Sequence, residues 1–558
     1  MTGGEALAAQ LIVEGVHDVF GVPGVQLDYA LDGLARHPDK IRFFNTRHEQ
    51  GAAYMADGYA RATGDVGVCM VVPGPGVLNA GAGLATAFAC SSRVLCIAGQ
   101  LPSWAIERHL GLLHEVPGQS QILASVTKWS TMARTPEQIP AAVRAAFREL
   151  RSGRPRPVAV EIPPDVLQAT CDVELIEPDP DEAGRTPADT EQLGLVAEAL
   201  RGAARPVIYA GGGVVSAVAS AELRQLAERL DSPVVLSRGG RGALSDRHRL
   251  ALSSVAGRRV IPHADVVLVV GSRFTTTMGA VVPTLPTTTL LGMNVDVNDL
   301  GPPRPYAHTV VCDAQLGLSA LADLIGPRRR DPAGADELNA ARLWAQAQCE
   351  AVVPQNAWLR SLRAAIPDDG LLVNELTQVG YLANVAYPVF TERAYIAPGY
   401  QGTLGYGFPT ALGAKAAHPH RPVVSITGDG GFGWCMSELS TARKYGLGVV
   451  TVIFNDAAFG NVRRTQHDTF ANRYIGSDLV NPDFVALGHA FGVHATRVST
   501  PAALQAELSN AIAVDQPALI EVTVGEMPSA WHLIMEVGEI PPSRTVCGET
   551  PGVPDCPS

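Results

Sequence analysis

The chain has 558 residues, of which 46% are hydrophobic and 18% are charged. This length exceeds what a single hydrophobic core serves, and it predicts about three domains of ordinary size. The formal net charge of −12 argues against non-specific nucleic-acid binding. No stretch approaches the roughly 18 uninterrupted apolar residues that a membrane span requires.

The cysteines and the amino terminus bear on where in the cell the protein is located. The nine cysteines are an odd number and are scattered without a C-x-x-C pair, which favours reduced thiols. The segment Met1–Leu7 has no basic region followed by an apolar core, so no signal peptide is evident. We therefore expect a cytoplasmic protein.

Short apolar runs alternate with helical patterns along the whole chain, which is typical of a parallel α/β architecture. Proline-, acid- or arginine-rich stretches at 177–182 and 328–332 are predicted to be linkers. We predict an α/β fold with three doubly wound parallel-sheet domains at 1–175, 186–330 and 345–540, followed by a tail at 541–558. The strands predicted for the first two domains are 41–44, 66–72, 94–97, 158–162, 205–209, 266–270 and 289–296.

One part of the third section brings together glycines and two carboxylates. Asp429 stands in the turn Gly428–Gly430 after a predicted strand at 423–426, and Asp456 follows a predicted strand at 449–454. The carboxyl ends of parallel strands face the ligand crevice, and glycine-exposed N–H groups suit a phosphate. Two carboxylates beside a phosphate need a cation, and their hard oxygens favour Mg²⁺ or Ca²⁺. The pattern predicts a metal-bridged diphosphate; the alternative is that each Asp only forms a turn or ends a strand.

The first section carries a second candidate group. Glu49 follows a predicted strand and opens a predicted helix rich in small residues, and the loop Pro73–Gly76 follows the next strand. A glutamate in a first turn also serves simply to complement the helix dipole. From these residues alone, both interpretations stay open.

Several motifs occur in one order along the chain: Arg47–Ala52, Pro73–Gly76, Gly153–Val158, Gly402–Gly405, and Gly428–Gly430 with Asn455–Asp456. That order resembles the thiamine diphosphate enzymes of the acetolactate synthase, pyruvate oxidase and benzoylformate decarboxylase group. The similarity extends from about Gly3 to about Glu526. Taken together, the motifs are specific for this superfamily and much less specific for the reaction.

The resemblance implies thiamine diphosphate and Mg²⁺ as cofactors, with named contacts. Glu49 would hydrogen-bond the aminopyrimidine and promote loss of the thiazolium proton, and Leu404 would bend the cofactor. Metal ligands would be Asp429, Asp456 and the carbonyl of Ala458, with Asp456 standing where the family usually has Asn. The implied cofactor contacts are Glu49, Pro73, Gly74, Asn79, Thr377, Gln378, Val379, Gly402, Leu404, Gly428, Asp429, Gly430, Gly431, Asp456, Ala458, Phe459 and Gly460.

The resemblance also implies a reaction and an assembly. The reaction would be decarboxylation of a 2-oxo acid followed by carboligation, through an ylide and an enamine, as in acetolactate synthases. Alternatives are C–C cleavage of an acyloin or diketone, FAD-linked oxidation, and a non-catalytic scaffold or regulatory binder; Glu49 argues against the scaffold. The family's active sites lie between subunits, so we expect a homodimer or a homotetramer.

Departures from the acetolactate synthase pattern concern the substrate. Val25 replaces a glycine, and His114 replaces a glutamine, so His114 is a candidate catalytic residue over the reactive carbon; the alternative is a surface-loop histidine. Asn461 and Thr465 replace a Met and a Trp, with Arg463-Arg464 between them. These arginines are either carboxylate ligands or solvated helix residues. FAD has little support, because the flavin-binding motifs of the family are only partly kept.

Overall fold

The computed structural model describes residues 1–178, 185–276, 279–327 and 332–535. The chain divides into two compact units. One unit contains the N-terminal and C-terminal sheets and is made from Met1–Gly184, Ser361–Gly380 and Arg393–Glu526. The other contains the central sheet and the remaining residues.

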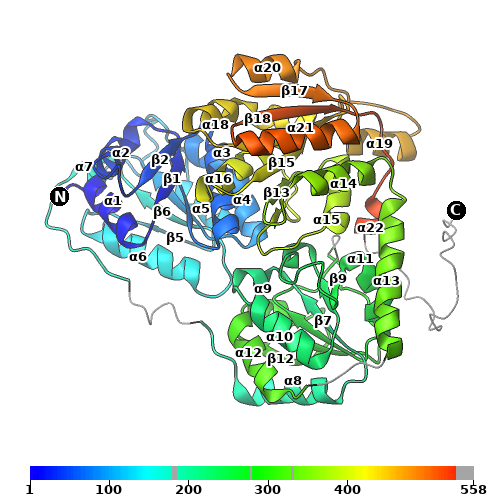
Figure 1. The fold of residues 1–558 in the computed structure, drawn as a ribbon. Helices are drawn as coiled ribbons and strands as arrows, with labels where there is room; N and C mark the ends of the chain where they lie inside the picture. Colours follow the sequence, from blue (N-terminus) through cyan, green and yellow to red (C-terminus); the bar gives the residue numbers. More distant parts are fainter. Residues whose placement is uncertain (179–184, 277–278, 328–331, 536–558) are drawn as a thin grey trace. The chain divides into compact units, whose positions relative to one another are not determined.

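The N-terminal sheet has six parallel strands in the order β2-β1-β3-β4-β6-β5, with helices on both faces (Figure 1). Its central strands are fully buried apolar runs, as expected for a sheet that is covered on both faces. The elements are α1 Gly3–Val13, β1 Asp18–Gly21, α2 Asp28–Ala35, β2 Arg42–Asn45, α3 Glu49–Thr63, β3 Gly67–Val71, α4 Pro75–Cys90, β4 Val94–Gly99, α5 Gln119–Val126, β5 Trp129–Met132, α6 Gln138–Arg151, β6 Val158–Ile162 and α7 Pro164–Gln168.

The central sheet has six parallel strands in the order β12-β11-β10-β7-β8-β9, which is the order of dinucleotide-binding sheets. A Cβ on Gly211 or Gly213 would collide with the backbone of Gly271. Close packing of two loops therefore accounts for these glycines without a nucleotide. The elements are α8 Thr190–Gly202, β7 Pro206–Ala210, α9 Gly212–Ser216, α10 Ser220–Leu230, β8 Val234–Leu236, β9 Ala251–Ser253, α11 Ser254–Val260, β10 Val266–Val270, β11 Thr289–Asn294, β12 Tyr306–Val311, α12 Ala314–Leu324 and α13 Pro332–Glu350.

The C-terminal sheet has the order β14-β13-β15-β16-β18-β17, which repeats the N-terminal order strand for strand. In both sheets the chain reverses its direction of travel between the first and third strands, and in open parallel sheets ligands bind at the carboxyl ends of the strands at such a point. The elements are α14 Gln355–Ala365, β13 Leu371–Asn374, α15 Gln378–Ala386, β14 Tyr395–Ile396, α16 Gly407–Ala417, β15 Val423–Gly428, α17 Asp429–Cys435, α18 Leu439–Tyr445, β16 Val449–Asn455, α19 Gly460–Thr469, α20 Phe484–Ala490, β17 His494–Val498, α21 Pro501–Val514, β18 Ala518–Thr523 and α22 Trp531–Ile534.

The predicted fold class is confirmed: three doubly wound parallel sheets follow one another along the chain. β6 and β10 coincide with their predicted strands residue for residue. The limits of the three domains stay predictions. The predicted linkers at 177–182 and 328–332 lie partly outside the described residues, and the predicted tail at 541–558 lies wholly outside them.

Helices α3 and α16 join the N-terminal and C-terminal sheets within one unit. A Cβ on Gly58 would overlap the carbonyl of Thr410, and a Cβ on Gly413 would overlap the carbonyl of Met55. Beside this contact the rings of Tyr54 and Tyr406 lie edge to face at 5.4 Å. The two helices therefore approach backbone to backbone, which only glycine permits at these positions.

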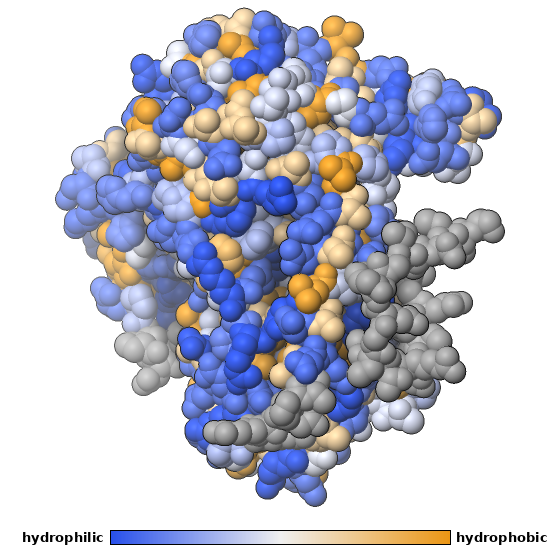
Figure 2. Space-filling model, turned by 45° about the vertical axis from the view of Figure 1, so that its right-hand side comes forward, coloured by the Kyte–Doolittle hydropathy of each residue, from blue (hydrophilic) through white to orange (hydrophobic). Residues whose placement is uncertain are grey.

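In the described ranges, no helix is both long enough and apolar enough to cross a membrane. On the face drawn in Figure 2, hydrophobic residues lie in small groups among hydrophilic ones.

The glycine contact between α3 and α16 can be tested by adding one methyl group. We expect Gly58→Ala to lower the free energy of unfolding by about 1–3 kcal/mol, because the new Cβ forces the two backbones apart. Gly194→Ala, on a helix where a Cβ would meet nothing within 4 Å, should be neutral or stabilise by up to about 1 kcal/mol. Thermal and urea denaturation measure both variants; equal stability of the two would contradict the packing argument.

Candidate active site

Glu49 begins helix α3 directly after strand β2. Its Oε2 accepts a hydrogen bond of 2.9 Å from Nδ2 of Asn79, which lies on α4. A Cβ on Gly76 would lie 3.6 Å from Oε1 of Glu49, so the Pro73–Gly76 loop passes close to the carboxylate. The structure thus brings together Glu49, Asn79 and the glycine loop, three features of the predicted pyrimidine end.

A second carboxylate holds the beginning of Glu49's helix. Glu438 is 1% exposed, and its Oε1 accepts the backbone N–H groups of Arg47 at 3.0 Å and His48 at 3.1 Å. Burial raises the pKa of Glu438 overall, although the hydrogen bonds from Thr441 and from these N–H groups act in the opposite direction. The C-terminal sheet therefore fixes the position from which Glu49 projects.

His114 lies against the same loop. Its backbone is in the left-handed region, with φ of +66°, and its Nδ1 is 3.1 Å from Oε1 of Gln26. A Cβ on Gly74 would collide with the carbonyl of His114, and the N–H of Gly74 donates to Gln119 at 2.7 Å. Whether His114 meets a substrate stays a prediction.

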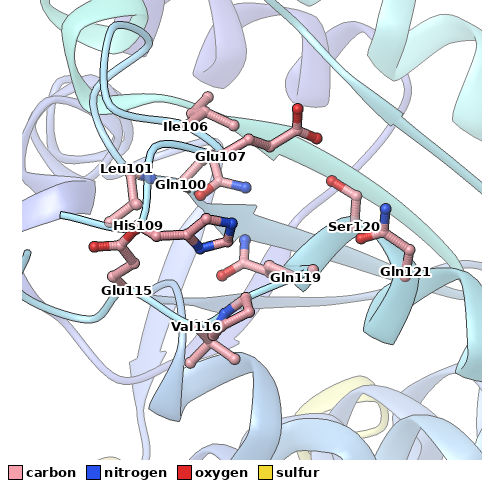
Figure 3. A pocket seen from close by; sticks show the side chains of 12 residues that line it. Gln100, Leu101, Ile106, Glu107, His109, Glu115, Val116, Gln119, Ser120 and Gln121 are labelled. Carbon is pink, nitrogen blue, oxygen red and sulfur yellow. Dashed lines mark hydrogen bonds between the residues drawn. The ribbon is translucent and has the colours of Figure 1, made fainter. Parts of the chain in front are cut away.

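The residues that follow His114, from Glu115 to Gln121, line a pocket together with residues of the 100–109 segment (Figure 3). Three of its lining residues, Gln100, Gln119 and Ser120, donate hydrogen bonds to Glu161 at 2.6–2.8 Å. At its rim, N–H groups of the Leu110–Leu112 segment donate to Glu115 and lower the pKa of that carboxyl. Gln119 also accepts the N–H of Gly74. It therefore connects the wall of this pocket to the glycine loop.

The second half of the site lies at the carboxyl ends of β15 and β16. These strands pair with Gly428 opposite Phe454, so Asp429 and Asp456 emerge side by side. Burial first, and then the charge of Asp429, raises the pKa of Asp456 to about 7; burial also raises the pKa of Asp429. Two neighbouring carboxylates in a poorly solvated place form a favourable site for a cation.

Asn481, on a loop that sequence reasoning missed, contacts one member of this pair. Its Nδ2 donates to Oδ2 of Asp429 at 2.6 Å and to Oδ1 of Asn455 at 3.1 Å. Ala458 pairs with Asp478 through an isolated bridge. Among the described residues no cluster of three His, Cys, Asp or Glu side chains is found, so Mg²⁺ would take its remaining ligands from carbonyl, diphosphate or water oxygens.

Side chains lie close against three glycines around the two carboxylates. A Cβ on Gly460 would collide with the carboxylate of Asp456, one on Gly430 would meet the ring of Phe459 at 2.6 Å, and one on Gly431 would collide with the carboxylate of Glu375. Such a glycine-lined turn exposes N–H groups to an anion. Together with the oxygen ligands, the residues present fit a metal-bound diphosphate.

Glu375 ties the parts of this half together, and sequence reasoning also missed it. The carboxylate accepts the N–H groups of Gly405 and Gly407 and the hydroxyl of Thr427, all at 2.9–3.0 Å. Burial raises the pKa of Glu375 despite these donors. Because Leu404 directly precedes Gly405, this single carboxylate fixes the Leu404 turn relative to the glycine turn after β15.

The other predicted contacts lie around the same crevice. The Oγ1 of Thr377 accepts the N–H of Gly380 at 3.0 Å, and Val379 is fully buried. The carbonyl of Leu404 accepts Nε2 of Gln50 at 3.5 Å, beside Gly402. The turn therefore reaches the helix that Glu49 begins.

Three segments of the chain match descriptions of one family. Residues 1–122 match the thiamine pyrophosphate enzyme N-terminal TPP binding domain, 193–321 the central domain, and 376–522 the C-terminal TPP binding domain. A probable 2-ketoarginine decarboxylase of Pseudomonas aeruginosa is 35% identical over 508 residues, covering 88% of each chain. The chain belongs to the thiamine pyrophosphate enzymes. Thiamine diphosphate is therefore the cofactor for which its domains are built.

Other relatives of this thiamine pyrophosphate enzyme carry a different activity in their names. A probable acetolactate synthase large subunit of Methanocaldococcus jannaschii is 33% identical over 549 residues, covering 94% of this chain and 92% of that protein. The acetolactate synthase isozyme 3 large subunit of Escherichia coli is 32% identical over 535 residues, covering 92% of each. The family is thus acetolactate synthase-like, as the motifs predicted.

Replacing Glu375 tests its role as a positioning residue in this thiamine pyrophosphate enzyme. Glu375→Gln turns one acceptor into an NH₂ group that faces a backbone donor, and an unsatisfied buried pair costs about 1–3 kcal/mol. We expect lower thermal stability and weaker binding of thiamine diphosphate, measured by calorimetry. Glu507→Gln, which changes only a contact to His494, should alter neither the thermal stability nor the cofactor affinity. Wild-type stability and affinity in Glu375→Gln would contradict the positioning role of Glu375.

Proposed function

We propose that this chain is a thiamine diphosphate- and Mg²⁺-dependent decarboxylase that acts on a 2-oxo acid and transfers the product to a second carbonyl compound, as an acetolactate synthase-like carboligase. The observation that carries the proposal is the pairing of two arrangements in one chain. Glu49 is held at a helix beginning by Asn79, and Asp429 and Asp456 end adjacent strands of a glycine-lined crevice.

Each residue has a distinct task in this proposal. When bound, thiamine diphosphate supplies a carbon nucleophile for the 2-oxo carbonyl and accepts the electrons that the departing CO₂ leaves behind. Glu49 shares a proton with the pyrimidine ring, and Asn79 orients its carboxylate for that exchange. Asp429, Asp456 and the carbonyl of Ala458 hold Mg²⁺ against the diphosphate.

We further propose that the active enzyme is a homodimer or homotetramer in which two chains complete each site. Among the described residues, no hydrogen bond joins Glu49 to Asp429 or Asp456. Val25 and Leu113 are 63% and 65% exposed beside the Glu49 half, and a second chain would cover such side chains.

A second candidate function is decarboxylation without carboligation, on a 2-oxo acid that carries a polar side chain. It is favoured by Asn461 and Thr465, which stand where acetolactate synthases have a Met and a Trp, and by the relative named as a probable 2-ketoarginine decarboxylase. Polar side chains at those places suit a substrate that offers hydrogen-bond partners.

The role of Glu49 is tested by exchange of the C2 proton of bound cofactor in D₂O. We expect Glu49→Gln to slow this exchange by about 10²–10⁴-fold, the usual contribution of a positioned acid or base. Cofactor affinity should stay within about threefold, since only one polar contact changes. Exchange at the wild-type rate would remove Glu49 from the mechanism.

A substrate panel separates the two candidate functions. With thiamine diphosphate and Mg²⁺, we expect CO₂ release from at least one of pyruvate, 2-oxobutyrate, benzoylformate and 2-oxo-5-guanidinopentanoate. Acetolactate formed from pyruvate assigns the carboligase. Aldehyde and CO₂ without acetolactate assign the second candidate, and no turnover by the cofactor-loaded protein would contradict both.

A further inference from the structure

Helix α19 carries two adjacent arginines that have different surroundings. Arg463 binds Asp478 at 2.8 Å and lies 3.7 Å from Glu526. Arg464 instead donates from Nη1 to Oε1 of Gln378 at 2.7 Å and from Nη2 to Oδ1 of Asn461 at 2.6 Å. The two side chains therefore leave the helix toward different partners.

Gln378 places Arg464 beside the metal-binding carboxylates. A Cβ on Gly460, the first residue of α19, would collide with the Asp456 carboxylate and would lie 3.1 Å from Nε2 of Gln378. The amide of Gln378 thus lies close to Asp456 and also accepts a hydrogen bond from the Arg464 guanidinium. Arg464 approaches the crevice where Asp429 and Asp456 meet.

The charges at this crevice call for a further cation. Asp429, Asp456 and a diphosphate together carry more negative charge than one divalent ion offsets. The family usually has Asn at the place of Asp456, so this chain adds one negative charge at a half-buried site, where Coulomb interactions are several times stronger than in water. Arginine is well suited to such a place, because it stays charged and binds phosphate oxygens.

We propose that Arg464 is the cationic residue of the diphosphate subsite and that its charge offsets the charge of Asp456. The proposal rests on the proposed function, because it presumes thiamine diphosphate and Mg²⁺ in this crevice. The alternatives are that Arg464 only positions Gln378 or that it binds a substrate carboxylate.

A double-mutant cycle on cofactor affinity distinguishes these roles. The dissociation constant of thiamine diphosphate is measured by calorimetry with Mg²⁺ for the full-length protein and for Arg464→Gln, Asp456→Asn and the double variant. We expect Arg464→Gln to weaken binding about tenfold, or about 1.4 kcal/mol, when Asp456 is present. In the Asp456→Asn background the same change should weaken binding by less than about threefold.

Two further variants control for folding and geometry. Arg463→Gln changes the neighbouring arginine, whose exposed ion pairs contribute little, and should leave cofactor affinity within about twofold. Arg464→Lys keeps the charge and should retain most of the affinity; if Arg464→Gln does not fold, the comparison of Arg464→Lys with Arg463→Gln decides the question. Weakening by Arg464→Lys as large as tenfold would then contradict the proposal.

Three outcomes overturn the proposal. An equal loss of affinity in both backgrounds shows that Arg464 only positions Gln378. Unchanged cofactor affinity with a raised KM for the 2-oxo acid shows that it binds substrate. If the wild-type protein itself does not bind thiamine diphosphate with Mg²⁺, the proposed function falls as well; if it binds and shows no coupling, only the role of Arg464 falls.

Discussion

The C-terminal half of the candidate site depends on one constraint: two carboxylates lie side by side at the ends of adjacent parallel strands. Asp429 and Asp456 lie there because β15 and β16 pair in register up to Gly428 and Phe454. Burial and, after it, the charge of Asp429 raise the pKa of Asp456 to about 7. Beside the pair lie a donor to Asp429 from Asn481 and a turn rich in glycine.

Buried carboxylates also do the structural work of joining separate segments. Glu375 accepts three donors from two other segments of the C-terminal sheet, and Glu438 accepts the N–H groups that precede Glu49. A carboxylate can accept several N–H bonds at once and gains more from each than a neutral acceptor does. These gains offset only part of the cost of burial, because burial still raises the pKa of both groups.

Much of the fold and part of the site could be predicted from the sequence, because those signals are local. Strand β6 and the glycine turn at Asp429 can each be recognised from a few consecutive residues. Glu375, Glu438 and Asn481 could not be found in this way, since each acts on residues far away in the chain; Glu438 binds a group 391 residues distant. The sequence also did not predict that the two outer sheets share one strand order, because two sheets can have the same topology without similar sequences.

Glu438 connects the two halves of the candidate site within one chain. It follows Asp429 by a single short helix, α17 (Asp429–Cys435), and a turn. The chain therefore runs from Asp429 through α17 to the carboxylate that accepts the N–H of His48, the residue before Glu49. A Cβ on Gly51 would collide with Glu438, so the beginning of α3 lies directly against this carboxylate. Within one chain, Asp429 and the residue before Glu49 are thus connected through one short helix and Glu438.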